Sequence, residues 1–167
     1  MTLTVGDEDR LFACAMKIER SAAKRLGQTI LVGVSCKLLM PPRPVISFGV
    51  AGALSDDLPV GQVVDINKVV DENGTVLWEG RPLGIRGAYV GAIVTTDHIV
   101  NNSQERLELC KRSGAKVVDM ETGIYAREGK LVGGARVISD SPRYPLTSMR
   151  GICVAPVALW VMHTFKL

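Results

Sequence analysis

Seven short runs of apolar and β-branched residues, several of them apolar on both faces, limit most strongly what this chain can fold into. Strands that are apolar on both faces are typical of parallel sheets covered by helices. Segments with helical periodicity lie between some of the runs. We therefore expect an α/β fold in which residues 1–167 form one domain, with a mostly parallel mixed sheet flanked by helices. The predicted strands span 11–15, 29–33, 45–48, 62–66, 89–95, 115–119 and 135–139.

Local signals place the helices and one hairpin. Asn102, with Glu105 three residues later, marks a helix start, and Gly114 marks its end. The predicted helices span 17–26, 103–113 and 121–128, and a buried terminal helix covers 152–162. This last stretch is too short to cross a membrane, which takes about 20 apolar residues. Residues 71–74 predict a turn between two short strands.

Composition excludes several classes of partner. The net charge is +3 and the basic residues are scattered, so no nucleic-acid surface is predicted. The four cysteines form no Cys-x-x-Cys pair, and the acidic first ten residues lack the order of a signal peptide. We therefore expect a cytoplasmic protein with no membrane partner. With two histidines and no clustered cysteines, neither a metal nor another cofactor is expected.

Carboxylates follow the apolar run at 115–119. Asp119 and Glu121 flank Met120 where a strand turns into a helix. Such acids at the carboxyl edge of a sheet lie where open α/β folds bind ligands. The alternative is an acidic first helical turn, which the helix dipole favours without any function.

Three weaker patterns also lie at predicted strand ends. The segment 48–54 is a glycine-containing loop that either approaches a ligand or makes a tight turn. Asp140 follows an apolar run and is either a site residue or a turn former. Glu19 lies in the first turn of a predicted helix, where the dipole alone explains an acid.

The four patterns together carry a resemblance. Ala15-Met-Lys-Ile-Glu19, Gly49-Val-Ala-Gly52, Asp119-Met-Glu121 and Ile138-Ser-Asp140 occur in this order. The set resembles the nucleoside phosphorylase and nucleosidase superfamily, and most closely methylthioadenosine/S-adenosylhomocysteine nucleosidases and hopanoid-associated phosphorylase-like proteins. The resemblance runs, with gaps, over nearly the whole chain, and its most specific part is the acid-Met-Glu element followed by Ile-Ser-Asp.

The resemblance implies roles for these residues. Glu121 would accept hydrogen bonds from ribose hydroxyls, Met120 would pack on the substrate, and Glu19 would activate water. Asp140 would be the general acid that protonates the departing base, a step that contributes about 10²–10⁴-fold. Several carboxylates in one desolvated cleft favour the protonated form that an acid needs. The remaining substrate-binding residues implied are Asp119, Phe48, Gly49, Val50, Ala51, Asp97 and Ile99, with His98 as an alternative to Asp97.

The implied reaction is cleavage of the N-ribosidic bond of a purine nucleoside or thioadenosine derivative. Glu19 favours water as the nucleophile, whereas a phosphorylase needs an anion pocket that the sequence does not reveal. The chain is shorter than members of that family, with a reduced helix at 34–40, so we expect exposed apolar surface and a homodimer. Val50 replaces a serine of the nucleosidases. Two alternatives to a nucleosidase therefore remain. The chain is a non-catalytic nucleoside-binding or oligomerisation module, or the acidic residues are only helix caps on an unrelated α/β domain.

Overall fold

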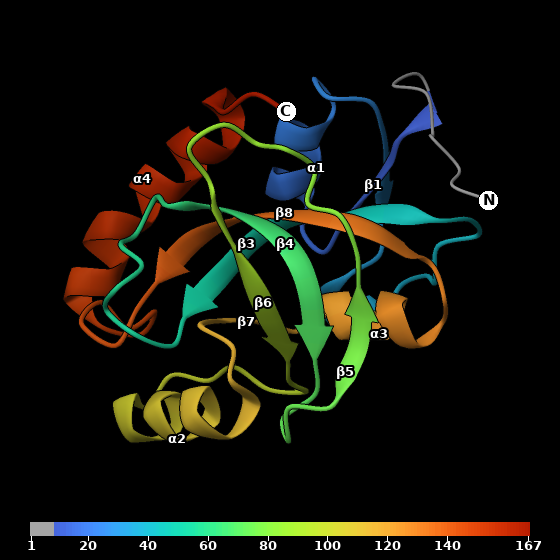
Figure 1. The fold of residues 1–167 in the computed structure, drawn as a ribbon. Helices are drawn as coiled ribbons and strands as arrows, with labels where there is room; N and C mark the ends of the chain where they lie inside the picture. The colour runs from blue at the N-terminus through green and yellow to red at the C-terminus, as the bar shows by residue number, and fades with distance from the viewer. Residues whose placement is uncertain (1–8) are drawn as a thin grey trace.

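The computed structural model describes residues 9–167 (Figure 1). Its helices are α1, α2, α3 and α4, with one short 3₁₀ turn, η2 (Val34–Cys36). None of these helices is long and apolar enough to cross a membrane. The elements in chain order are β1 (Leu11–Cys14), α1 (Lys17–Ala23), β2 (Gln28–Leu31), η2, β3 (Val45–Ala53), β4 (Val63–Val70), β5 (Val76–Glu79), β6 (Tyr89–Thr95), α2 (Ser103–Ser113), β7 (Val117–Asp119), α3 (Thr122–Arg127), β8 (Leu131–Asp140) and α4 (Met149–Thr164).

The strands form a mixed sheet that closes on itself. The order β2-β1-β3-β7-β6-β4-β5 is supplemented by β8, which pairs with both β3 and β4. The strands β3, β7, β6, β4 and β8 therefore make a closed ring, and β1, β2 and β5 extend from it. Most pairings are parallel, while β3–β7, β4–β5 and β4–β8 are antiparallel. The α/β class and the mostly parallel mixed sheet are thus confirmed.

Helices cover the sheet over distinct apolar clusters. Helices α1 and α4 pack over β1, β3 and β8, where Phe12, Phe48, Ala22, Ala158 and Met162 are buried together (Figure 1). A second cluster of buried apolar side chains lies between α2 and the closed ring of strands. A third cluster lies between α3 and the sheet. Burial on both faces explains why several strands read as continuous apolar runs.

The strand β3 is longer than predicted. The sequence places a loop at 48–54, but β3 runs to Ala53 because its glycine segment is paired on both sides, with β8 and with β7. Gly49 has φ 154°, and a Cβ there would lie 2.3 Å from the Glu19 Oε1 atom. The glycine therefore admits the Glu19 carboxylate rather than forming a turn.

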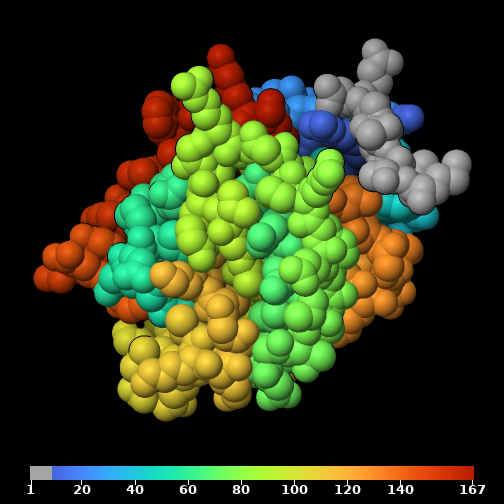
Figure 2. Space-filling model, viewed as in Figure 1, coloured from blue at the N-terminus to red at the C-terminus, as the bar shows by residue number. Residues whose placement is uncertain are grey.

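The terminal helix α4 is less buried than predicted. Its inner residues Gly151, Ala158 and Met162 are covered, but Met149 is 76% exposed and Trp160 is 68% exposed. The helix lies along the edge of the molecule, in red in Figure 2. An apolar face of this kind is common at protein–protein contacts. The homodimer, which would bury it, stays a prediction.

Candidate functional site

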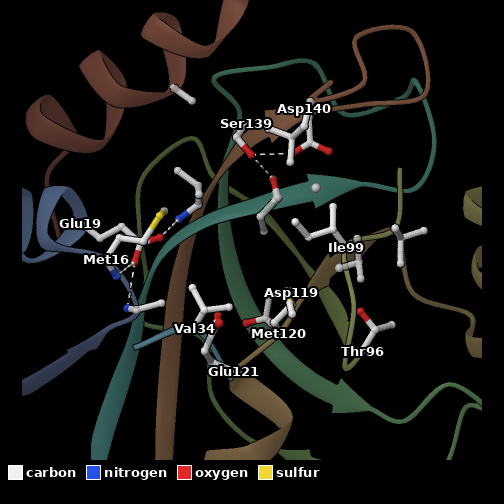
Figure 3. A pocket seen from close by; sticks show the side chains of 18 of the residues that line it. Met16, Glu19, Val34, Thr96, Ile99, Asp119, Met120, Glu121, Ser139 and Asp140 are labelled. Carbon is white, nitrogen blue, oxygen red and sulfur yellow. Dashed lines mark hydrogen bonds between the residues drawn. The ribbon is translucent and has the colours of Figure 1, made fainter. Parts of the chain in front are cut away.

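A cavity of about 350 Å³ lies between β3, β7, β8 and the start of α1, with α4 along one side. This volume is in the range of small-molecule sites. Four carboxylates line the cavity although their residues are nearly fully buried: Glu19, Asp119, Glu121 and Asp140. Figure 3 shows Glu19, the pair Asp119 and Glu121, and Asp140 approaching the cavity from three sides. Residues that are remote along the chain thus meet at one place.

Strand register explains this meeting. Gly52 of β3 is paired with Val118 of β7 on one side and with Asp140 of β8 on the other. The ends of β7 and β8 therefore flank the same part of β3. The sequence suggested that the site lies at the carboxyl edge of a parallel sheet. In the structure β8 runs parallel to β3 but β7 runs antiparallel to it, so the two strands reach the site from opposite directions.

Glu19 is held by backbone donors. Its Oε2 accepts hydrogen bonds from the Ala15 and Met16 amides, both at 2.9 Å, and its Oε1 accepts one from Val50 at 3.0 Å. Glu19 thus caps α1, as the dipole argument anticipated, and also faces the cavity. Burial raises the pKa of its carboxyl group, although Arg136 and the amides act against this. A carboxyl group with a raised pKa and a fixed position suits a general base.

Arg136 is the buried counter-charge of the acid cluster. Its Nη2 lies 2.6 Å from Asp119 Oδ2 and 3.6 Å from Glu121 Oε2. Asp119 also accepts hydrogen bonds from Thr95 and Thr122. Asp119 therefore lines the cavity while its oxygens are bonded to protein partners, and its contact with a substrate stays a prediction.

Glu121 has unused acceptor capacity. Although it precedes α3, its side chain makes no capping bond and instead accepts the Ser35 amide at 3.0 Å. Burial and the neighbouring Asp119 charge raise the pKa of Glu121 to about 7, while Arg136 lowers it. The helix-cap interpretation does not explain this placement. The expected bond from a sugar hydroxyl to Glu121 stays a prediction.

The raised pKa of Glu121 predicts pH-dependent stability. The folded protein holds a proton that the unfolded chain, with an ordinary glutamate pKa of 4.5, has released. The free energy of unfolding should therefore fall by up to about 3 kcal/mol between pH 5 and pH 8. Urea titrations measure this. Glu121→Gln should flatten much of the decline, while Glu128→Gln on the exposed end of α3 should not, and an equal decline in all three proteins would refute the assignment.

Asp140 is surrounded differently from the sequence expectation. Ser139 donates a hydrogen bond to Asp140 Oδ1 at 2.6 Å, and Arg106 forms an ion pair with Oδ2. The charged group in contact with Asp140 is thus a cation rather than a neighbouring acid, and the role of Asp140 as the general acid stays a prediction.

The two buried arginines were missed by the sequence analysis. Arg136 interrupts the otherwise apolar run of β8, and a charge inside a buried strand must be paired. Arg106 lies three residues before Leu109 on the inward face of α2. The sequence pattern alone could have predicted that both arginines are buried. It could not have predicted their ion-pair partners, since each partner lies on another helix or strand.

Of the remaining candidate substrate-binding residues, some line the cavity and others do not. Met120, Val50, Ala51 and Ile99 line the cavity. Phe48 instead packs in the core with its ring 5.9 Å from those of Phe12 and Phe165, and Gly49 lies behind the Glu19 carboxylate. The Asp97 side chain is 94% exposed and does not line the cavity, whereas the neighbouring His98 does.

A cation site is poorly supported. Glu72, Asp97 and His98 bring potential ligand atoms within 4.8 Å of one another, but Asp97 and His98 are exposed. Both ring nitrogens of His98 are already bonded, to Asp97 at 2.8 Å and to Glu105 at 2.6 Å. These bonds raise the pKa of His98 to about 8. The ring is therefore engaged by protein carboxylates.

Known structures share this fold. No protein-family model and no curated protein matches the sequence. The 5'-methylthioadenosine/S-adenosylhomocysteine nucleosidase of Helicobacter pylori aligns with a TM-score of 0.68 at 15% identity, over 95% of this chain and 96% of that chain. A futalosine hydrolase mutant of Helicobacter pylori strain 26695 gives 0.67 at 13% identity, over 93% and 95%. The corresponding nucleosidase of Neisseria meningitidis, in complex with methylthio-immucillin-A, gives 0.65 at 17% identity, over 92% and 94%. The resemblance seen in the sequence is thus confirmed at the level of the fold.

Proposed function

We propose that this chain is a nucleosidase, which cleaves the N-ribosidic bond of a purine nucleoside or thioadenosine derivative with water as the nucleophile. One observation carries the proposal: Glu19, Glu121 and Asp140 converge on a single cavity of about 350 Å³. Structures with the same fold include a nucleosidase mutant with 5'-methylthioadenosine in its active site. The fold and the cavity together support a small nucleoside as the ligand.

The carboxylates have distinct tasks in this reaction. Glu121 accepts hydrogen bonds from the ribose hydroxyls, and Glu19 takes a proton from the attacking water. The bond between C1' and the base breaks with its electron pair moving to the base, while a proton on Asp140 passes to a ring nitrogen of that base. The ribosyl group becomes cationic in the transition state, and a carboxylate-lined cavity stabilises this charge.

Water is favoured over phosphate by the position of Glu19. The amides of Ala15, Met16 and Val50 form a cluster of donors of the kind that binds anions. The Glu19 carboxylate already occupies this cluster. Phosphate would have to displace a carboxylate and then lie against its negative charge, which opposes phosphorolysis.

A panel of nucleosides tests the proposal. Purified protein is incubated with adenosine, inosine and 5'-methylthioadenosine, with and without phosphate, and the released base and sugar are separated by chromatography. We expect free base and free ribose or thioribose in both conditions. Sugar 1-phosphate formed only with phosphate would show a phosphorylase, and binding by thermal shift without turnover would show the non-catalytic module instead.

The cytoplasmic location stays a prediction.

A further inference from the structure

The turn η2 places two residues other than glycine in the left-handed backbone conformation. Ser35 has φ 53° and Cys36 has φ 56°. Residues with a Cβ atom rarely adopt this conformation, because the Cβ atom crowds the following carbonyl oxygen. Such residues persist only where the surrounding structure holds them, and they cluster at functional sites. The backbone of η2 therefore points to a function beyond reversing the chain.

Several contacts hold η2 in this conformation. The Leu38 amide closes the base of the turn by donating to the Val32 carbonyl at 2.9 Å. The Cys36 side chain packs against a buried apolar cluster. The Ser35 amide donates outside the turn, to Glu121 Oε1 at 3.0 Å. A left-handed residue thus presents its N–H group to a carboxylate that lines the cavity.

The position of Glu121 depends on this donor, because its charged neighbours do not hold it at the cavity. Asp119 carries a like charge and repels it. Arg136 attracts Oε2 from 3.6 Å, a distance too long for a hydrogen bond. Without the amide on Oε1, the Glu121 carboxylate would be drawn onto Arg136, away from a ligand. The Ser35 amide therefore opposes the attraction of Arg136.

Building on the proposed function, we propose that Ser35 is the positioning residue of Glu121: its backbone amide fixes Oε1, so that Oε2 accepts a hydrogen bond from a ribose hydroxyl. The left-handed conformation aims this amide at Glu121. Val34, the preceding residue, lines the same cavity, and Figure 3 shows it on the Glu121 side. The turn thus makes the site select ribosides over deoxyribosides, since a missing hydroxyl leaves a buried acceptor unpaired.

Exchange of one backbone amide for an ester tests this role without changing any side chain. Supplying residue 35 as its α-hydroxy acid replaces the N–H group by an oxygen atom, which cannot donate a hydrogen bond and repels the Glu121 carboxylate. The same exchange at Leu38 removes a different hydrogen bond of the turn, to Val32, and is the matched control. The Leu38 side chain is 69% exposed, so it tolerates the exchange as a surface residue.

Kinetics with adenosine, 2'-deoxyadenosine and 3'-deoxyadenosine measure the consequence. In the wild type we expect kcat/KM for adenosine to exceed that for at least one deoxy analogue by about 10²-fold. The ester at residue 35 should lower this ratio by about tenfold, with the loss in the rate for adenosine. The ester at residue 38 should leave the ratio unchanged. A merely structural role would lower the rates for all three nucleosides together and keep their ratio.

A double-mutant cycle gives a second readout that needs no activity. Denaturant unfolding is measured for the wild type, the ester at residue 35, Glu121→Met and the protein that combines both changes. If the amide holds Glu121, the unfolding constant of the combined protein should differ about tenfold from the product of the separate effects. The ester at residue 38 combined with Glu121→Met should show no such coupling.

The results either support or overturn the role of Ser35. Equal selectivity in the wild type and the ester at residue 35, equal effects of the two esters, or an absence of coupling would overturn it. If that ester does not fold, Ser35→Val and Ser35→Ala replace it in both measurements. A β-branched residue opposes the left-handed conformation more than alanine does, so valine should lower the selectivity and alanine should keep it. Equal selectivity in these two variants would also overturn the role.

Failure of the proposed function gives a different result. If the wild type cleaves no nucleoside while a known nucleosidase does so beside it, the proposed reaction is refuted. The double-mutant cycle is independent of turnover, so it still decides whether the Ser35 amide holds Glu121.

Discussion

Asp140→Asn is expected to lower kcat for a purine nucleoside by about 10²–10⁴-fold, the usual contribution of a general acid. The side-chain amide cannot transfer a proton to the departing base. Its carbonyl oxygen can still accept the hydrogen bond from Arg106, so the buried pair at this position keeps its geometry. The loss should therefore appear in kcat in a protein that still folds, although the free energy of unfolding should also fall because buried Arg106 loses its counter-charge.

Steady-state kinetics with two substrates check this expectation. The large loss should occur with the purine nucleoside, whereas a 4-nitrophenyl riboside should be cleaved by Asp140→Asn nearly as well as by the wild type. Asp57→Asn makes the same change at an exposed ion pair with Lys116 and should leave both rates unchanged. Equal turnover of the purine nucleoside by the wild type and Asp140→Asn would remove Asp140 from the mechanism.

Sequence signals between residues close together in the chain predicted the bounds of helices and strands reliably. The helix α2 spans Ser103–Ser113 as predicted, because Asn102 bonds the amides of the first turn and Gly114 adopts the left-handed conformation that ends it. The predicted strand 89–95 also matches β6 (Tyr89–Thr95). Each of these features depends on residues within a few positions of one another. Their physical cause is therefore contained in the sequence window that predicts them.

Long-range pairing was the part that sequence reasoning could not supply. The ring closes because β8 bonds to β4 as well as to β3, and these antiparallel and parallel pairings join residues about 70 to 90 positions apart. The same limit applied to the site. The acids Glu19, Glu121 and Asp140 were found at element ends, but the cations Arg136 and Arg106 were not assigned, since a buried charge reveals its partner only in the folded chain.

The opposite charges divide the cavity into two electrostatic halves. Arg136 serves Glu19, Asp119 and Glu121 on one side, where a sugar and an attacking water would lie. Arg106 serves Asp140 on the other side, where a base would lie. Each arginine side chain is nearly inaccessible to solvent, so its charge is weakly screened. Each half of the cavity therefore has its own buried cation.

Arg136→Met is expected to destabilise the protein by about 3–5 kcal/mol, the usual cost of leaving buried charges without their partner. The side chain is 1% exposed and donates to Asp119 and, at 2.7 Å, to the Ser47 hydroxyl. Methionine fills a similar volume but leaves Asp119, Glu121 and Glu19 uncompensated. For a chain of this size the midpoint of thermal unfolding should fall by about 10 °C.

The pH dependence identifies the cause of that loss. Because the pKa values of Glu19 and Glu121 are raised, both residues gain protons more readily than ordinary glutamates as the pH falls from 8 to 5. Protonation removes the uncompensated charge, so the destabilisation by Arg136→Met should be smaller at pH 5 than at pH 8. Chemical denaturation at both pH values measures this difference, with Arg127→Met on the exposed side of α3 as control. A loss of equal size at both pH values would assign the effect of Arg136 to packing rather than to charge.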